Sequence, residues 1–302
     1  MLRFAIFICT VATIAVVPGI ITAQELDSLP IYGSQLEVDV YGNLVTLDRD
    51  RNLLLLYSPN GDRVRELGGQ GWGNEQFDRP SGIAARNGID IFVADYGNHR
   101  IQRFDRNLSF VSSLFTRDAD DERRRFGYPS DVALSRLGEL FICDSENTRI
   151  VKVNRFSEVE RTFGGFDAGE GRLRSPLQLK IGPKDQLYVL DEKRVVVFDT
   201  FGNFLHVLAG SLFRKPSAIF ADGERVLVLD EQLIYSFDTE DRPDRVIDLE
   251  TVAEGRLKGK DIRSLAYADS ALYFLTRSGL LILTGTDALE SKQAVDKDEK
   301  SR

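Results

Sequence analysis

The sequence predicts an all-β protein, a six-bladed β-propeller made of four-stranded antiparallel blades. Two observations carry this prediction. A short apolar run ending in Asp occurs five times, with 47, 49, 47 and 39 residues between the ends of successive runs, and a sixth run ending in Thr follows after 46 more. These distances match the roughly 40 to 50 residues of one propeller blade. Continuous apolar runs of four or five residues between turn-forming residues are also typical of strands buried on both faces, as stacked blades require.

Each run is the expected second strand of a blade. A first strand begins near a Pro or Gly, a third strand ends in a large apolar residue, and an outer strand completes the unit. From the end of a run to that large apolar residue, the count is nine in the first three units and seven in the last three. The sequence therefore predicts three blades with long turns followed by three with short turns. The six runs are Asn43–Asp48, Ile91–Asp95, Leu140–Asp144, Leu187–Asp191, Val226–Asp230 and Leu272–Thr276.

Closure of the ring needs a strand from the other end of the chain. The last unit supplies only three strands, at 263–267, 271–276 and 280–284, so its outer strand must come from elsewhere. We expect the segment 26–32 to provide it. A competing closure would use residues 288–295, but the charged residues that follow favour a disordered polar tail over 287–302. The propeller is then expected to span residues 24–286 as a single domain.

The N-terminal residues have the pattern of a secretory signal peptide. Arg3 is followed by uncharged residues up to Ala23, with an apolar centre that Pro18 and Gly19 interrupt. We expect cleavage after residue 23, no membrane span in the mature chain, and an exported protein that is periplasmic or secreted. Cys143 then remains as the single thiol of the mature chain, and its apolar surroundings predict a buried, inert side chain.

Composition excludes several kinds of chemistry. The net charge of -8 disfavours nucleic acid as a partner, because nucleic-acid binding rewards clustered Lys and Arg. Two His and two Cys cannot build a tri-histidine catalytic zinc site or a four-cysteine structural site. The sequence also lacks a Gly-x-Ser-x-Gly elbow, a phosphate-binding glycine loop and a Cys-x-x-Cys pair, which argues against serine hydrolases, NTPases and thiol redox enzymes.

The second and third units carry a more specific pattern. Asp95–Phe104 and Asp144–Val153 share the order Asp, Asn, Arg and Ile, and Pro80–Ala84 and Pro129–Ala133 precede them at matching distances. With the glycines before Phe77, these segments resemble the NHL repeat. The resemblance implies a propeller, here an exported bacterial member of the family. Asp95 with Arg100, and Asp144 with Arg149, are expected to form a network within the turn of each blade rather than a catalytic pair.

Candidate ligand-binding residues fall into two groups. Inner strands of a propeller line its central channel, so we aligned the residue before the first apolar position of each inner strand. The alignment gives Glu37, Gly82, Asp131, Gln178, Ala218 and Ser264. The second group is in loops: Trp72, which lies between two glycines, and Tyr96 and His99 in a long turn.

These groups support two functional hypotheses. We favour a non-catalytic, monomeric binding scaffold without a cofactor that recognises a protein, peptide or glycan of the cell envelope, since loops rather than strands carry binding. The alternative is a calcium-dependent hydrolase, similar to lactonase-like propellers, with a channel cation held by Glu37 and Asp131. Two carboxylates fall short of the six or more oxygen ligands that calcium prefers, so a water-filled channel is favoured over a metal site.

Overall fold

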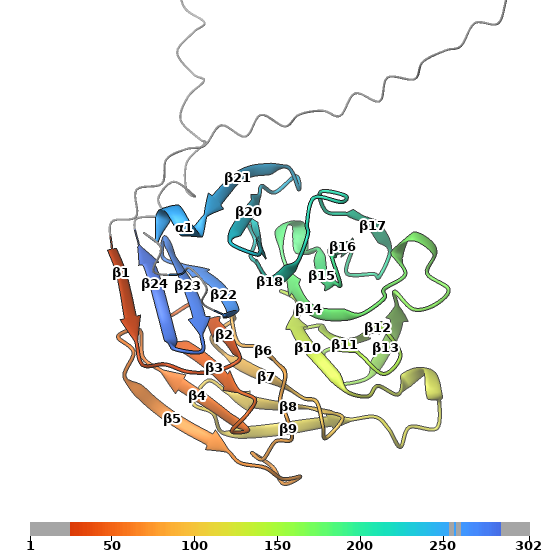
Figure 1. Ribbon diagram of the computed structural model, residues 1–302. Helices are drawn as coiled ribbons and strands as arrows, with labels where there is room; N and C mark the ends of the chain where they lie inside the picture. Colours follow the sequence, from red (N-terminus) through yellow and green to blue (C-terminus); the bar gives the residue numbers. More distant parts are fainter. Residues whose placement is uncertain (1–24, 254–256, 258–260, 285–302) are drawn as a thin grey trace, which may run out of the picture.

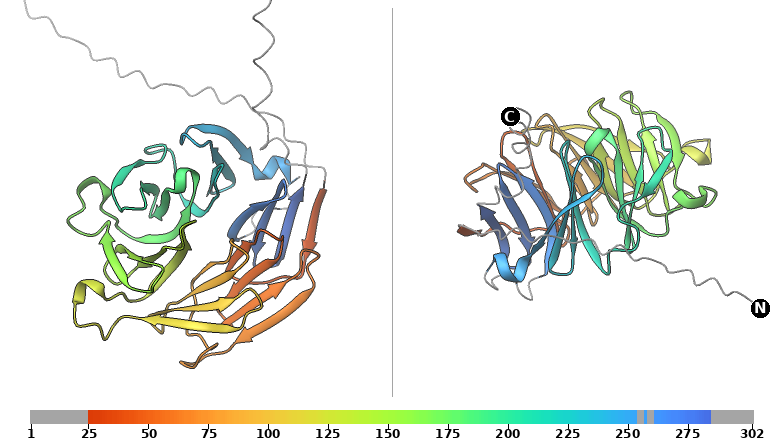
Figure 2. Two further views of the ribbon diagram at one scale, coloured as in Figure 1. Left: turned by 180° about the vertical axis from the view of Figure 1, so that it is seen from behind. Right: turned by 90° about the horizontal axis from the view of Figure 1, so that it is seen from above.

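The computed structural model describes residues 25–253, 257 and 261–284. Within these ranges the chain forms six four-stranded antiparallel sheets, and Figure 1 shows them as blades around a common centre. The view from behind in Figure 2 shows the same succession of blades around the ring. The predicted six-bladed β-propeller is confirmed.

The first three blades each take four consecutive strands. Blade 1 contains β2 (Gln35–Val38), β3 (Leu44–Asp48), β4 (Leu53–Tyr57) and β5 (Arg63–Gly68). Blade 2 contains β6 (Gly82–Ala84), β7 (Asp90–Asp95), β8 (Arg100–Asp105) and β9 (Phe110–Phe115). Blade 3 contains β10 (Pro129–Leu134), β11 (Leu140–Asp144), β12 (Arg149–Val153) and β13 (Val159–Phe163).

The remaining blades follow the same order, except at the junction of the two chain ends. Blade 4 contains β14 (Pro176–Ile181), β15 (Leu187–Asp191), β16 (Arg194–Phe198) and β17 (Phe204–Val207). Blade 5 contains β18 (Pro216–Ala221), β19 (Val226–Asp230), β20 (Leu233–Phe237) and β21 (Pro243–Asp248). Blade 6 contains β22 (Ile262–Ala268), β23 (Ala271–Thr276) and β24 (Gly279–Thr284) together with β1 (Glu25–Leu29). Short helices lie between strands: η1 (Glu122–Arg124), η2 (Gly169–Gly171), η3 (Pro183–Asp185) and α1 (Leu249–Val252).

The turns between the second and third strands differ in length as predicted. In blades 1 to 3, four residues join these strands; in blade 2, for example, they lie between the paired residues Asp95 and Arg100. In blades 4 to 6, two residues join them; in blade 4 they lie between Asp191 and Arg194. We call the face that carries these turns the upper face. The opposite face, where the first and second strands of each blade are joined, is the lower face.

Strand β1 closes the ring. It pairs antiparallel with β24, from Glu25 opposite Thr284 to Leu29 opposite Leu280. The prediction that an N-terminal strand completes the last blade is therefore confirmed. The expected signal peptide (1–23), the competing closure segment (288–295) and the polar tail (287–302) lie outside the described residues.

The hydrophobic core lies between neighbouring blades. Every residue of β11, β15 and β19 is buried, as the uninterrupted apolar runs predicted. Between blades 1 and 2, for example, Leu47 and Leu54 pack in one cluster with Phe77 and Phe104. Each such side chain contributes about 1.5 to 3 kcal/mol on burial, so the blade interfaces provide most of the stabilisation. None of the helices in the described ranges is long and apolar enough to cross a membrane.

Cys143 lies inside this core, as predicted. It is completely buried in β11, and burial raises the pKa of its thiol well above the ordinary value. A thiol that stays protonated and out of contact with solvent is a poor nucleophile, which agrees with the expected inert side chain.

Candidate functional site

In blades 2 to 5, the Asp that ends the apolar run accepts hydrogen bonds from backbone N–H groups just before the first strand of its own blade. Asp95 Oδ1 accepts a hydrogen bond from the backbone N–H of Asp78 at 2.8 Å, while Oδ2 accepts from Asn98 Nδ2 at 2.9 Å and from Arg100 Nε at 2.8 Å. The remaining nitrogens of Arg100 donate to the carbonyls of Trp72, Gly73 and Gln76. The equivalent contact in blade 3 is Arg149 Nε to Asp144 Oδ2, at 2.9 Å. The predicted turn network is confirmed, and it fixes the upper-face loops in position.

At the upper end of the channel, polar side chains of inner strands connect one blade to the next. Asp131 Oδ2 accepts from the backbone N–H of Leu179 at 2.9 Å, and Gln178 Oε1 accepts from that of Ile219 at 3.0 Å. Ser264 Oγ accepts from the backbone N–H of Leu36 at 3.1 Å, which joins the last blade to the first. Three of the predicted channel residues therefore form links between blades.

The alignment of blade 1 was wrong by two residues. Gln35 pairs with Leu47, the residue before the final Asp of its apolar run, just as Gln178 pairs with Leu190 and Ser264 with Leu275. Gln35, not Glu37, therefore occupies the ring position shared with Asp131 and Gln178. Glu37 lies one step deeper on the same side of the strand, because side chains two residues apart share a face.

Glu37 forms an ion pair across the channel. Its carboxylate lies 2.5 Å from Lys180 Nζ, and blades 1 and 4, which carry these residues, face each other in a ring of six. Glu37 is buried and Lys180 is half-buried. Burial alone lowers the pKa of Lys180, but the neighbouring Glu37 and Asp131 carboxylates raise it above its ordinary value, so the amine is charged. A charge pair thus joins opposite blades across the channel.

Asp131 is completely buried beside this pair. Burial raises its pKa to about 6, against the opposing effects of the Lys180 charge and of the hydrogen bonds from Leu179 and Val132. Its two carboxylate oxygens accept from backbone N–H groups, and Glu37 accepts from Lys180. A calcium ion would have to displace Lys180 to reach both carboxylates. In the described part of the chain, no three His, Cys, Asp or Glu side chains are grouped so as to hold a metal.

The candidate loop residues Tyr96 and His99 lie together on the upper face, where they join Tyr128. The Tyr96 and Tyr128 ring centroids are 5.2 Å apart, and those of His99 and Tyr128 are 4.1 Å apart in an edge-on arrangement. The guanidinium groups of Arg49 and Arg79 lie over the Tyr96 ring, at 5.5 and 5.6 Å. We call these five side chains the upper aromatic patch. Tyr96 and Arg49 also line the upper mouth of the channel, a depression of about 510 Å³.

His99 is held as a neutral acceptor. Its Nδ1 accepts from the backbone N–H of Tyr128 at 3.1 Å, and Arg117 Nη1 lies 3.2 Å from the same nitrogen. Burial, followed by the charge of Arg117, lowers the pKa of His99 below its ordinary value. His99, Tyr128 and Arg79 also have positive φ angles of 52, 47 and 51°, as other turn residues of the chain do, a conformation that costs side-chain-bearing residues energy.

Trp72 lies at the edge of the same face. Its side chain is 55% exposed, with its ring edge-on to Phe115 at 5.7 Å and the Arg100 guanidinium over it at 5.3 Å. Arg117, two residues after Phe115, contacts His99, so the protein surface continues from Trp72 to the upper aromatic patch. Trp72 is therefore exposed and at the same time packs against strand β9 of blade 2.

Sequence reasoning missed Tyr128, Arg79, Arg49 and Lys180. The repeat itself contained a signal for two of them, because Arg79 and Tyr128 each precede the Pro that opens the inner strand of their blade. A comparison of those two positions would have placed both residues on the same face. His206 lies in outer strand β17, and its Nε2 is 2.9 Å from Asp241 Oδ2 of the next blade, away from the channel.

Comparisons with known proteins agree with this architecture. The NHL repeat matches residues 77–104 and 126–153, which lie in blades 2 and 3. Protein brain tumor of Drosophila melanogaster is 33% identical over 135 residues, 43% of this chain and 12% of that protein. B-box type zinc finger protein ncl-1 of Caenorhabditis elegans is 30% identical over 141 residues, 46% of this chain and 16% of that protein. The chain thus spans less than a fifth of these relatives, and both come from animals.

Solved structures share the fold at low identity. A virginiamycin B lyase from Staphylococcus aureus, determined with quinupristin, has a TM-score of 0.59 and 15% identity over 85% of this chain and 82% of the lyase chain. A chain of a nidogen/laminin complex has a TM-score of 0.54 and 17% identity over 70% of this chain and 78% of its own. Likeness at this level extends to the fold alone. The protein is a six-bladed β-propeller whose second and third blades match the NHL repeat.

Proposed function

We propose that the protein is an exported, non-catalytic binding scaffold that holds an acidic segment of a partner protein on its upper face. The observation that carries the proposal is the upper aromatic patch, where Tyr96, His99 and Tyr128 meet Arg49 and Arg79. Tyr, Trp and Arg side chains dominate binding energy at protein interfaces, because each offers a large contact area together with a polar group.

The charges of this face favour a partner that carries carboxylates. Arg49 and Arg79 are exposed, although the whole chain has a net charge of -8. Both guanidinium groups lie over the Tyr96 ring, and Arg79 also forms an ion pair with Asp78 at 3.3 Å. A local excess of guanidinium groups attracts acidic side chains and can bind them through two hydrogen bonds.

The geometry of the channel does not favour the alternative, a calcium-dependent hydrolase. Glu37 and Asp131 are occupied by Lys180 and by backbone N–H groups, and the relatives with solved structures share only the fold. The proposed role therefore depends on the upper-face loops and not on the channel interior.

Site-specific photo-crosslinking in the producing cells tests the proposal. A benzophenone amino acid at Trp72, beside the patch, is expected to give a covalent adduct with a protein. The same group at Phe156, which is 71% exposed in the turn between β12 and β13 on the lower face, serves as control. Tyr128→Ala should remove most of the Trp72 adduct. Equal adducts at both positions, an adduct insensitive to Tyr128→Ala, or an adduct with glycan alone would contradict the proposal.

Export is tested separately by N-terminal sequencing of the protein from producing cells. The uncharged segment between Arg3 and Gln24 leads us to expect a mature chain that begins at Gln24. A chain that still begins at Met1 would contradict export, without affecting the binding proposal.

A further inference from the structure

The lower end of the channel opens into a second cavity, of about 510 Å³, which shares no lining residue with the upper mouth. This size lies within the roughly 300 to 1,000 Å³ of small-molecule sites. Its walls come from the ends of the inner strands and the turns that follow them. Part of the wall is apolar and includes Ala84, Leu134 and Ile181.

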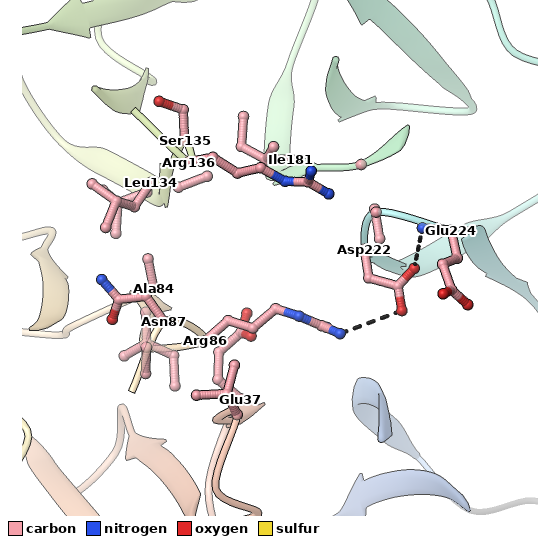
Figure 3. Close-up of a pocket in the computed structure, with 18 residues that line it drawn as sticks. Glu37, Ala84, Arg86, Asn87, Leu134, Ser135, Arg136, Ile181, Asp222 and Glu224 are labelled. Carbon is pink, nitrogen blue, oxygen red and sulfur yellow. Dashed lines mark hydrogen bonds and ion pairs between the residues drawn. The ribbon is translucent and has the colours of Figure 1, made fainter. Parts of the chain in front are cut away.

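Two arginines from neighbouring blades border this cavity. Figure 3 shows Arg86 and Arg136 on opposite sides of the open space, with both guanidinium groups directed toward the turn that contains Asp222 and Glu224. Arg86 Nη2 lies 3.3 Å from Asp222 Oδ2, and its guanidinium stacks over the Phe220 ring at 4.7 Å. Arg136 reaches as far as Gly223, where a Cβ would lie 2.2 Å from Arg136 Nη2.

Each acidic side chain that lines this cavity already has a cationic partner. Arg86 is balanced by Asp222, Glu224 is paired with Arg225 at 3.4 Å, and Glu37 is paired with Lys180. Arg136 is exposed and has no hydrogen-bond or ion-pair partner in the part of the chain that the structure describes. A guanidinium group at the mouth of a partly apolar cavity is a donor for a planar anion, which it can bind through two parallel hydrogen bonds.

We propose that the lower cavity binds a small organic carboxylate. The carboxylate group lies between the guanidinium groups of Arg136 and Arg86, and the apolar body of the ligand packs against Ala84, Leu134 and Ile181. The ion pair of Glu37 and Lys180 forms the inner limit of the site. This site is separate from the upper aromatic patch, so the two can be occupied independently.

Fluorine NMR with 4-fluorobenzoate tests this proposal, with 4-fluorobenzamide as the neutral probe of the same shape. The purified protein should broaden the 4-fluorobenzoate resonance and leave that of the amide unchanged. Arg136→Gln should weaken binding about tenfold or more, the loss expected for a hydrogen bond to a charged group. Arg123→Gln, at an arginine that is 87% exposed and outside the cavity, is the matched control and should bind as the unmodified protein does.

Three results would overturn the proposal: no broadening of 4-fluorobenzoate, equal broadening of the acid and the amide, or unchanged binding by Arg136→Gln. Displacement of 4-fluorobenzoate by an equal concentration of inorganic phosphate would also overturn it, because phosphate has no apolar body. Thermal unfolding of Arg136→Gln should match that of the unmodified protein, since the Arg136 side chain is exposed. The crosslinking at Trp72 is unaffected by Arg136→Gln if the two sites are separate.

Discussion

Replacement of Lys180 by Met removes the cation that faces both carboxylates in the channel. Lys180 Nζ lies 2.5 Å from the Glu37 carboxylate, and the two side chains are only 15% and 10% exposed. Loss of one partner of a buried pair leaves an uncompensated charge, which costs about 3 to 5 kcal/mol of folding free energy. At about 2 to 4 °C per kcal/mol, the midpoint of thermal unfolding should fall by about 6 to 20 °C.

A double variant separates the loss of a charge partner from the loss of packing. Glu37→Met together with Lys180→Met replaces the pair with apolar side chains of similar volume. Removal of both charges costs far less folding free energy than removal of one. The double variant should therefore be about 2 kcal/mol or more stable than Lys180→Met. Arg63→Met is the control, because Arg63 forms a 2.8 Å ion pair with Glu66 but is 61% exposed, and it should change stability by less than about 1 kcal/mol.

The effect of Lys180→Met should also depend on pH. The folded-state pKa of Asp131 is about 6, above the ordinary value of 3.8, so stability falls as pH rises from 3.8 through 6. Without Lys180 this folded-state pKa rises further, and the variant should lose more stability at pH 8 than at pH 5. Urea unfolding at both pH values measures the effect. A loss below about 1 kcal/mol, or a double variant no more stable than Lys180→Met, would refute the reasoning.

Three further predictions concern the upper face and the ring. Asp95→Ala should destabilise the protein by about 3 to 5 kcal/mol in urea unfolding, because Arg100 is only 5% exposed and loses its carboxylate; a loss below about 1 kcal/mol would contradict the turn network. The pKa of His99, measured by NMR with His206→Gln to assign the two histidines, should lie below 6.5. The contribution of His99 to stability should then be complete above pH 6.5 and decrease as pH falls below it. A pKa above 6.5 would contradict the neutral acceptor role. Gly82→Ala should cost about 1 to 3 kcal/mol in urea unfolding, because its Cβ would lie 2.2 Å from Asp131 Oδ1 and 2.6 Å from Asp131 Cα, whereas Gly165→Ala, with its nearest atom at 3.8 Å, should be close to neutral; equal effects would contradict the close approach.

The sequence predicted the features that depend on local spacing. Asp95 and Arg100 are five residues apart at the two ends of one turn, so the repeat alone placed them in contact. The position of β1 followed from the count of strands in the last unit, since a ring with an unpaired edge would be exposed to aggregation.

Contacts that depend on ring geometry were beyond sequence reasoning. Glu37 and Lys180 are 143 residues apart and meet only because blades 1 and 4 face each other. The sequence alignment chose Glu37 instead of Gln35 for a simpler reason. Side chains two residues apart on a strand share a face, so the apolar pattern does not distinguish the two positions. Tyr128 was missed because its left-handed conformation, which brings it to His99, depends on the loop that precedes β10.

Thermal unfolding with calcium, and separately with a chelator, tests the central claim, that the polar groups of the channel hold the ring together and leave binding to the two faces. A ligand that binds only the folded state raises the unfolding midpoint. Because Glu37 and Asp131 already have internal partners, we expect the same midpoint with calcium and with chelator. A rise in midpoint with calcium that disappears in Glu37→Ala or Asp131→Ala would contradict it and would favour the hydrolase alternative.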